Sequence, residues 1–331
     1  MIVKIFVHIG VLALFLALLP FVPAHTTMGA APRQVTLWLD WYPNSDHAGI
    51  YVAMARGYYA RRGLAVQARV PSGSADALKL VAAGNGDLAV SYEPSLLLAR
   101  KNKVPVVATA AIVQSPLNCV MTLRISGITR PRQLVGKTVA VAGVESDYTD
   151  IAAMVRHDGG DPAKVKTVAV DYGLLPQLFK GRVDAVEGVY WTWEALQAQR
   201  QGYKVNVMRL DRYGVPSYDE LIFATGAGQL AREGATLKLF QQATFEGYAY
   251  AAAHPAEAAR ILLKAPGVLS KDAGLIEQSI RLLASSERDA RGRYGALSAA
   301  RWQAYADWML RTGLVKKHID AHAAISTALL P

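Results

Sequence analysis

The chain has 331 residues, of which 52% are hydrophobic and 19% are charged. This length and composition predict a globular protein with a hydrophobic core and room for two domains of ordinary size. The formal net charge is +10, but the basic residues are scattered and form no stripe interleaved with aromatic residues, so nucleic acid is not an expected partner.

Residues 1–24 show the pattern of a secretory signal peptide. Lys4 precedes a long apolar run, and Val22, Pro23 and Ala24 offer small residues where a signal peptidase cuts. We expect cleavage after Ala24, or as late as about residue 31. A membrane anchor is the alternative, because the apolar run approaches the shortest length that spans a bilayer.

Cys119 is the only cysteine in the chain. A single cysteine far from the cleavage site excludes an internal disulfide, a lipid anchor on a processed N-terminal cysteine and a cysteine-based metal site. Its apolar surroundings, "NCVMTL", predict a buried thiol that behaves as a small hydrophobic side chain. We therefore expect a protein that is free in the periplasm of a cell with two membranes, and not a lipoprotein.

Short apolar runs alternate with helical patterns along the chain. Strands are predicted at 34–39, 64–70, 87–92 and 104–113, and helices at 48–62, 74–84 (with Ser74 as N-cap) and 94–102. The pattern starts again with a strand at 136–142, a helix at 146–159, a strand at 164–170, and a helix, strand and helix within 174–199. From about residue 222 the chain is chiefly helical, at 235–253, 255–264, 271–286 and 298–311. Strands that alternate with helices predict mainly parallel sheets with helices on both faces.

Two stretches of the chain share one plan. In 78–99 and in 175–198 an amphipathic helix is followed by a glycine, two further residues, an aspartate and a buried strand. The glycines are Gly84 and Gly181, and the aspartates are Asp87 and Asp184. An aromatic residue and a glutamate then open the next helix in both stretches. This indicates two domains built on the same scheme, although Gly-x-x-Asp is also good turn chemistry anywhere.

Aromatic residues beside carboxylates follow three of the predicted strands. The first strand is followed by Asp40, Trp41, Asn44 and His47, the third by Tyr92 and Glu93, and the repeat's strand by Tyr190, Trp191 and Glu194. Ligands of open α/β sheets bind beyond the carboxyl ends of the strands. Flat aromatic faces stack on a planar ring, and carboxylates accept hydrogen bonds from ring amines. These strand ends therefore predict a site for a small, nitrogen-rich heteroaromatic ligand.

Each of these side chains also has a structural interpretation. The tryptophans suit a core, His47 suits a hydrogen-bonded structural position, and the carboxylates suit helix first turns. A sulfonate, phosphate or nitrate would instead require Arg, Lys or free helix N-termini. The loop 140–150 offers Gly143 and Ser146 as a weak anion site. The sequence has no close metal-ligand spacing, no nucleophile elbow and no phosphate-cradling lysine loop, so no metal, cofactor or catalytic residue is expected.

Four quoted segments carry a family resemblance: "LDWYPNSDHAGIYVAMARGYY", "AAGNGDLAVSYE", "LVGKTVAV" and "YWTWEA". Over roughly 34–312 the chain resembles the periplasmic binding proteins for pyrimidine precursors of thiamine, the NMT/thiamine-pyrimidine group within the alkanesulfonate- and nitrate-binding superfamily. The resemblance implies a type II periplasmic binding protein with two α/β lobes and a two-segment hinge. The first lobe would comprise 33–115 and 218–331, and the second 116–217.

The resemblance also implies a function and a site. A hydroxymethylpyrimidine- or formylaminopyrimidine-type ligand would close the lobes, and a monomer would deliver it to an inner-membrane ABC permease with its ATPase. Trp41, Tyr190 and Trp191 would sandwich the ring. Asp40, Glu93 and Glu194 would bind its polar edges, and Tyr218 would complete the wall. Asn44, His47 and Tyr92 complete the expected site.

Other members of the group make the pyrimidine enzymatically from a histidine and pyridoxal phosphate. His47 lies at their histidine position. However, "SYEPSLLLA" contains no lysine to hold that cofactor, and their cysteine-rich iron-binding run is absent. We therefore expect a binding protein and not an enzyme. Riboflavin, a sulfonate or another aromatic compound remain alternative ligands, and sensing remains an alternative to import.

Overall fold

The computed structural model describes residues 1–2, 31–73 and 76–330. Residues 3–24 of the expected signal peptide lie outside these ranges, as do the expected cleavage sites up to residue 30 and the expected cap Ser74. The chain from Pro32 onward forms one compact unit. Within the described ranges, none of the helices is both long enough and apolar enough to cross a membrane.

Five strands form a first sheet in the order β2-β1-β3-β10-β4. They are β1 (Arg33–Trp38), β2 (Leu64–Arg69), β3 (Leu88–Ser91), β4 (Val106–Val113) and β10 (Leu221–Gly226). Strand β1 runs parallel to β2 and β3, whereas β10 is antiparallel to β3 and β4. Its crossover helices are α1 (Ala48–Ala55), α2 (Ala77–Ala82) and α3 (Glu93–Lys101).

A second sheet repeats this arrangement in the order β7-β6-β8-β5-β9. Its strands are β5 (Asn118–Leu123), β6 (Thr138–Val141), β7 (Lys166–Ala169), β8 (Ala185–Tyr190) and β9 (Val205–Arg209). Strand β6 runs parallel to β7 and β8, and β5 is antiparallel to β8 and β9. Its helices are α4 (Glu145–His157), α5 (Leu174–Phe179) and α6 (Glu194–Arg200). The expectation of two α/β sheets with flanking helices is confirmed.

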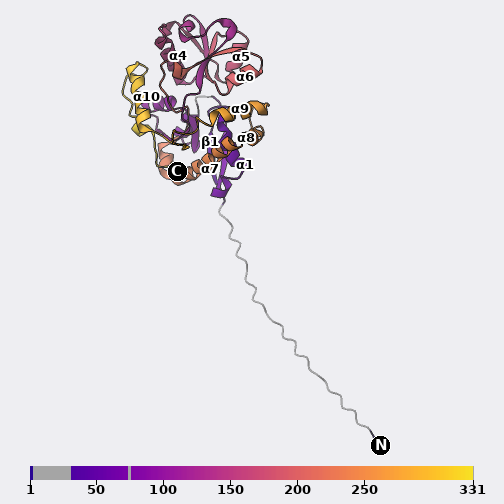
Figure 1. The fold of residues 1–331 in the computed structure, drawn as a ribbon. Coiled ribbons are helices and arrows are strands. Elements are labelled where there is room, and N and C mark those ends of the chain that lie inside the picture. The colour runs from indigo at the N-terminus through magenta and orange to yellow at the C-terminus, as the bar shows by residue number, and fades with distance from the viewer. Residues whose placement is uncertain (3–30, 74–75, 331) are drawn as a thin grey trace. The chain divides into compact units, whose positions relative to one another are not determined.

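Four further helices cover the first sheet: α7 (Ala227–Ala253), α8 (Pro255–Leu262), α9 (Ala273–Leu283) and α10 (Ala299–Arg311). Alternate residues of β10 show that both faces are covered, because Phe223 packs in the core with α1 and α7 while Ile222 packs in the core with α10. Helices α7 and α8 lie beside α1, so segments that are far apart in the sequence pack side by side (Figure 1). A Cβ at Gly247 would lie 2.0 Å from the Gly49 carbonyl oxygen, which explains why glycine stands at this contact.

The element boundaries differ from the sequence prediction in several places. Strands β5, β9 and β10 were not predicted, because each is a short apolar run that pairs antiparallel with strands far along the chain. The helix expected at 48–62 ends at Ala55, since Gly57 adopts a φ of +71° and a turn follows. Helix α7 begins at Ala227, eight residues before its expected start, with a kink at Glu233.

The internal repeat expected from the two Gly-x-x-Asp segments is confirmed by matching contacts. Asp87 accepts a hydrogen bond from the Thr36 backbone N–H at 2.7 Å, and Asp184 accepts one from the Thr138 backbone N–H at 2.8 Å. In each sheet the aspartate therefore ties the start of one strand to its parallel neighbour. The preceding glycines, Gly84 and Gly181, have φ values of +79° and +64°, which a residue with a side chain rarely adopts.

Cys119 lies on β5 and is fully buried. Its Sγ lies 3.1 Å from the Val189 carbonyl oxygen, to which it donates. Burial raises the pKa of the thiol well above its ordinary value. The prediction of a buried thiol is confirmed.

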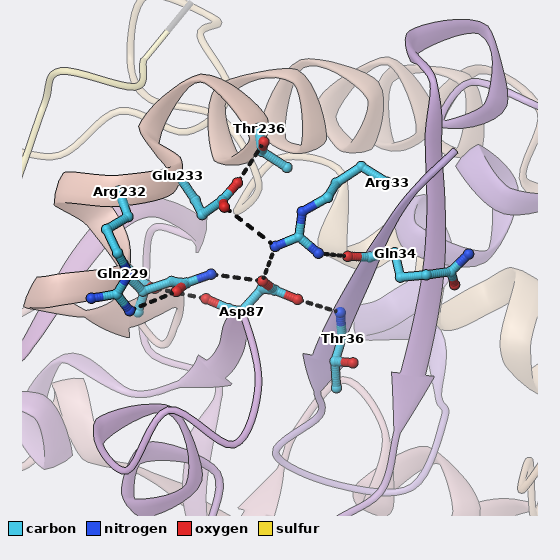
Figure 2. A network of polar contacts seen from close by, with 9 residues as sticks. Arg33, Gln34, Thr36, Asp87, Gln229, Arg232, Glu233 and Thr236 are labelled. Carbon is cyan, nitrogen blue, oxygen red and sulfur yellow. Dashed lines mark hydrogen bonds and ion pairs between the residues drawn. The ribbon is translucent and has the colours of Figure 1, made fainter. Parts of the chain in front are cut away.

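The first-sheet copy of the repeated aspartate has additional partners (Figure 2). Asp87 Oδ1 accepts from Gln229 Nε2 at 2.7 Å and from the Arg33 guanidinium at 3.2 Å. The same guanidinium lies 3.6 Å from the Glu233 carboxylate. Because Gln229 and Glu233 belong to α7, Asp87 connects this helix to the start of β3, the central strand of the first sheet.

The two aspartates make a matched pair of test positions. Asp87→Ala should lower the free energy of unfolding by about 2–3 kcal/mol, because a nearly buried carboxylate loses several charge-assisted hydrogen bonds. Asp184→Ala should cost about 1 kcal/mol, since that side chain is 39% exposed and retains water. Urea unfolding followed by tryptophan fluorescence measures both values, and equal losses would contradict the role given to the α7 contacts.

Candidate functional site

A cavity lies where the ends of strands from both sheets meet. Its empty space is about 550 Å³, including open solvent at its mouth. We call it the ligand cavity. The side of the first sheet contributes Asp40, Trp41, Asn44, Tyr92 and Pro94, and the chain leading into β10 contributes Tyr218 and Glu220. The side of the second sheet contributes Asn118, Ala142, Val144, Ser146, Asp147, Asp150, Gly188, Tyr190 and Glu194.

Asp40 is held in place by two neutral donors. Tyr92 donates its hydroxyl to Asp40 Oδ2 at 2.9 Å, and His47 Nε2 lies 2.9 Å from Oδ1. The backbone N–H of Asn44 donates to His47 Nδ1 at 3.3 Å, so Nδ1 carries no proton and Nε2 is the donor to Asp40. His47 therefore fixes the orientation of Asp40, with both ring nitrogens engaged.

Glu220 joins the two chain segments that connect the sheets. Its Oε2 accepts from the backbone N–H groups of Leu117 at 2.6 Å and Asn118 at 2.9 Å, on the segment that enters β5. It also accepts from the Tyr218 hydroxyl at 3.0 Å, on the segment that returns to β10. The same carboxylate lines the ligand cavity, so a group bound there would contact both connections. Sequence reasoning selected Tyr218 and missed Glu220 two positions later.

Two acidic residues of α4 line the ligand cavity from the other side. Asp147 accepts from the backbone N–H groups of Gly143 at 2.9 Å and Val144 at 3.0 Å. The Gly143 N–H group is therefore occupied, which removes one of the two donors of the weak anion site expected at Gly143 and Ser146. Asp150 is 1% exposed, and its Oδ1 has no hydrogen-bond partner among the described residues. The unpaired oxygen is suited to accept from a donor on a ligand.

Seven of the ten residues predicted from the sequence line the ligand cavity: Asp40, Trp41, Asn44, Tyr92, Tyr190, Glu194 and Tyr218. The other three do not. His47 lies behind Asp40, and Glu93 is buried with its Oε2 bound to the Asp219 backbone N–H at 2.7 Å. Trp191 donates its indole N–H to the Pro116 carbonyl oxygen at 3.3 Å and lies under the Arg209 guanidinium. These three support the cavity wall from outside.

The residues that sequence reasoning missed are Asn118, Asp147, Asp150 and Glu220. A pattern was available for the α4 pair, because "ESDYTD" repeats acidic residues along the first turns of a helix that follows a strand. Asn118 had no such signal. Its side chain accepts from the Cys119 and Gly188 backbones and donates to Glu187 at 2.8 Å, a role that only the β5–β8 pairing creates.

The cavity is acidic and carries no lining lysine or arginine among the described residues. Burial raises the pKa of Asp147, Glu194 and Glu220 to about 7 each, although backbone N–H donors oppose the shift. Burial also raises the pKa of Asp150 well above its ordinary value, with Asp147 adding repulsion. The described residues contain no group of three or more His, Cys, Asp or Glu side chains placed to hold a metal ion. The arrangement can accept hydrogen bonds from a neutral or cationic ring and opposes an anion.

These raised pKa values predict a specific pH dependence of stability. Between about pH 4.5 and pH 7 the three carboxyls hold protons in the folded chain that they release in the unfolded chain, so the free energy of unfolding falls as pH rises. Thermal unfolding of ligand-free protein should therefore give a higher Tm at pH 5 than at pH 7. Glu220→Gln should reduce this difference. A Tm that rises from pH 5 to pH 7 would show that the carboxyls are ionised throughout.

The chain is similar to known proteins over much of its length. The family model described as "NMT1/THI5 like" matches residues 44–258. A formylaminopyrimidine-binding protein of Halalkalibacterium halodurans is 32% identical over 96% of this chain and 98% of its own length. A 4-amino-5-hydroxymethyl-2-methylpyrimidine phosphate synthase of Saccharomyces cerevisiae, THI13, is 27% identical over 47% of this chain and 46% of its own.

Among solved structures, the alkanesulfonate-binding protein SsuA of Xanthomonas axonopodis pv. citri, bound to MOPS, superposes with a TM-score of 0.72. The alignment covers 90% of this chain and 99% of that protein at 14% identity, and it establishes the two-lobed periplasmic-binding-protein fold. By its family match and its near full-length relative, the chain belongs to the NMT1/THI5-like family.

Proposed function

We propose that this protein is the periplasmic solute-binding protein of an ABC importer and that its ligand is a thiamine pyrimidine precursor of the formylaminopyrimidine type. The observation that carries the proposal is the ligand cavity itself, where aromatic side chains and carboxylates meet and no lysine or arginine lines the wall among the described residues. The relative from Halalkalibacterium halodurans, similar over nearly its whole length, supports the same ligand class.

In this proposal the ring lies against Trp41 and Tyr190, whose faces supply stacking and burial. The ring nitrogens and amino group donate to the carboxylates around them, of which Asp40 is oriented by His47 and Asp150 has an unpaired oxygen. Ligand contact with residues of both sheets favours the closed arrangement, which an importer in the inner membrane recognises. Lobe 1 would comprise 33–115 and 218–331, and lobe 2 would comprise 116–217.

The alternatives are weaker on the same geometry. A sulfonate or nitrate would bring negative charge beside Asp147 and Glu220, and the described residues place no lysine or arginine on the cavity wall to offset it. A synthase that consumes its histidine would have to free His47, which is 1% exposed and bonded through both ring nitrogens. Riboflavin is neutral, so the charge of the cavity does not distinguish it from the pyrimidines. Direct titration with each compound makes that distinction.

The function is tested with protein that has been unfolded and refolded to remove any bound ligand. Formylaminopyrimidine and hydroxymethylpyrimidine, each at about 100 times its Kd, should stabilise the protein by about 2.7 kcal/mol, visible as a rise in Tm. Taurine and nitrate should give no shift. Stabilisation by riboflavin or taurine alone would refute the pyrimidine assignment.

Two tryptophans provide a matched test of the site. Trp41→Ala should weaken formylaminopyrimidine binding by about 1–3 kcal/mol, because the ring loses a stacking face and buried area. Trp191→Ala should change affinity much less, since Trp191 does not line the ligand cavity. Isothermal titration calorimetry gives both Kd values. Equal losses of affinity would mean that Trp191 contacts the ligand, which would contradict its position outside the ligand cavity.

A further inference from the structure

A second hollow borders the ligand cavity and shares part of its wall. Its empty space is about 820 Å³, including open solvent, and we call it the outer groove. Trp41, Asn44 and Glu194 line both spaces, so the two are adjacent at these side chains. The mechanism proposed above uses only the inner space and leaves the outer groove without a role.

The outer groove is built from aromatic rings. Its lining includes Trp41, Tyr42, Tyr172, Phe179 and Trp193. Tyr172 comes from the second sheet's side and meets rings of the first: its centroid lies 4.6 Å from that of Trp41 and 4.7 Å from that of Tyr42. Its hydroxyl also donates to the Pro71 carbonyl oxygen at 3.2 Å. These contacts hold the aromatic wall together across the two sheets.

Among the described residues, the outer groove is lined by a single charged side chain, which is acidic. That side chain is Glu194. Several aromatic faces together with one carboxylate form the type of surface that attracts an organic cation, because the ring faces and the carboxylate both carry negative potential. A cation here would also favour the ionised form of Glu194, whose pKa burial raises to about 7.

We propose that the outer groove binds a second, positively charged ring that is tethered to the pyrimidine in the ligand cavity. This inference rests on the proposed function, because the pyrimidine anchors the ligand. It extends the ligand class from single-ring precursors to pyrimidines that carry a cationic heterocycle. Trp41 lies at the boundary and contacts both parts of such a ligand. The exposed Leu269, at 64% of its full accessibility, forms part of the rim.

The test compares two probes and two lysine substitutions. Thiamine carries a pyrimidine and a cationic thiazolium ring, whereas hydroxymethylpyrimidine carries the first ring alone. Gln197 on α6 lines the outer groove, and Gln199 on the same helix is exposed and does not line it. Gln197→Lys therefore places a positive charge in the groove, and Gln199→Lys places the same charge on the same helix outside it.

By calorimetric titration, the unmodified protein should bind thiamine at least about tenfold more tightly than hydroxymethylpyrimidine. Gln197→Lys should weaken thiamine binding by about five- to tenfold and leave hydroxymethylpyrimidine within about twofold, while Gln199→Lys changes neither. Thermal unfolding of both variants without ligand checks that they are folded.

Two results overturn the inference while the proposed function stands: thiamine binding no tighter than hydroxymethylpyrimidine, or an equal effect of the two lysine substitutions. If neither probe nor formylaminopyrimidine binds the unmodified protein, the proposed function fails, and the inference fails with it.

Discussion

Burying a carboxylate costs free energy unless donors replace the water that it loses. In the ligand cavity these donors are neutral: backbone N–H groups serve Asp147 and Glu220, and a phenol and an imidazole serve Asp40. Neutral donors satisfy the oxygens but leave their charge uncompensated, so several carboxyls share one low-dielectric space and repel one another. The site is therefore incomplete until a group that donates hydrogen bonds or carries positive charge enters it. Its ligand preference and its pH behaviour both follow from this constraint.

The same constraint separates the site from the fold that carries it. The alkanesulfonate-binding protein from Xanthomonas shares this two-lobed architecture over nearly its whole length at 14% identity. The cavity described above presents carboxylates at the strand ends where an anion would need cations. Under the function proposed above, a common scaffold supports opposite charge preferences, because the side chains at the strand ends can change while the sheets that position them do not. Residues such as Asp87 and Asp184 belong to that scaffold and lie just before the central strands β3 and β8.

Much of the fold could be predicted from the sequence, because the parallel strands carry clear apolar runs followed by helices. The antiparallel strands β5, β9 and β10 were missed because their partners lie far along the chain and no local pattern marks them. In the site, the aromatic residues beside carboxylates were found because strand ends are predictable positions. Glu93 and Trp191 occupy such positions too, yet their side chains bond to the chain segments that connect the two sheets instead. The local sequence predicts that a residue lies at the end of a strand. The direction of its side chain depends on how neighbouring segments pack around it.

The buried thiol of Cys119 has a practical consequence. It lies on β5, which runs antiparallel to both of its neighbours, β8 and β9, and its high pKa keeps it protonated and unreactive while the sheet is intact. A thiol reagent can reach it only when β5 separates from a neighbour or when the whole sheet opens. Because the chain contains one cysteine, the rate of its modification would measure how often this one part of the molecule opens, without any engineered label. Ligand added to the cavity would slow this modification, and the logarithm of the rate would fall with the part of the binding free energy that opposes the opening.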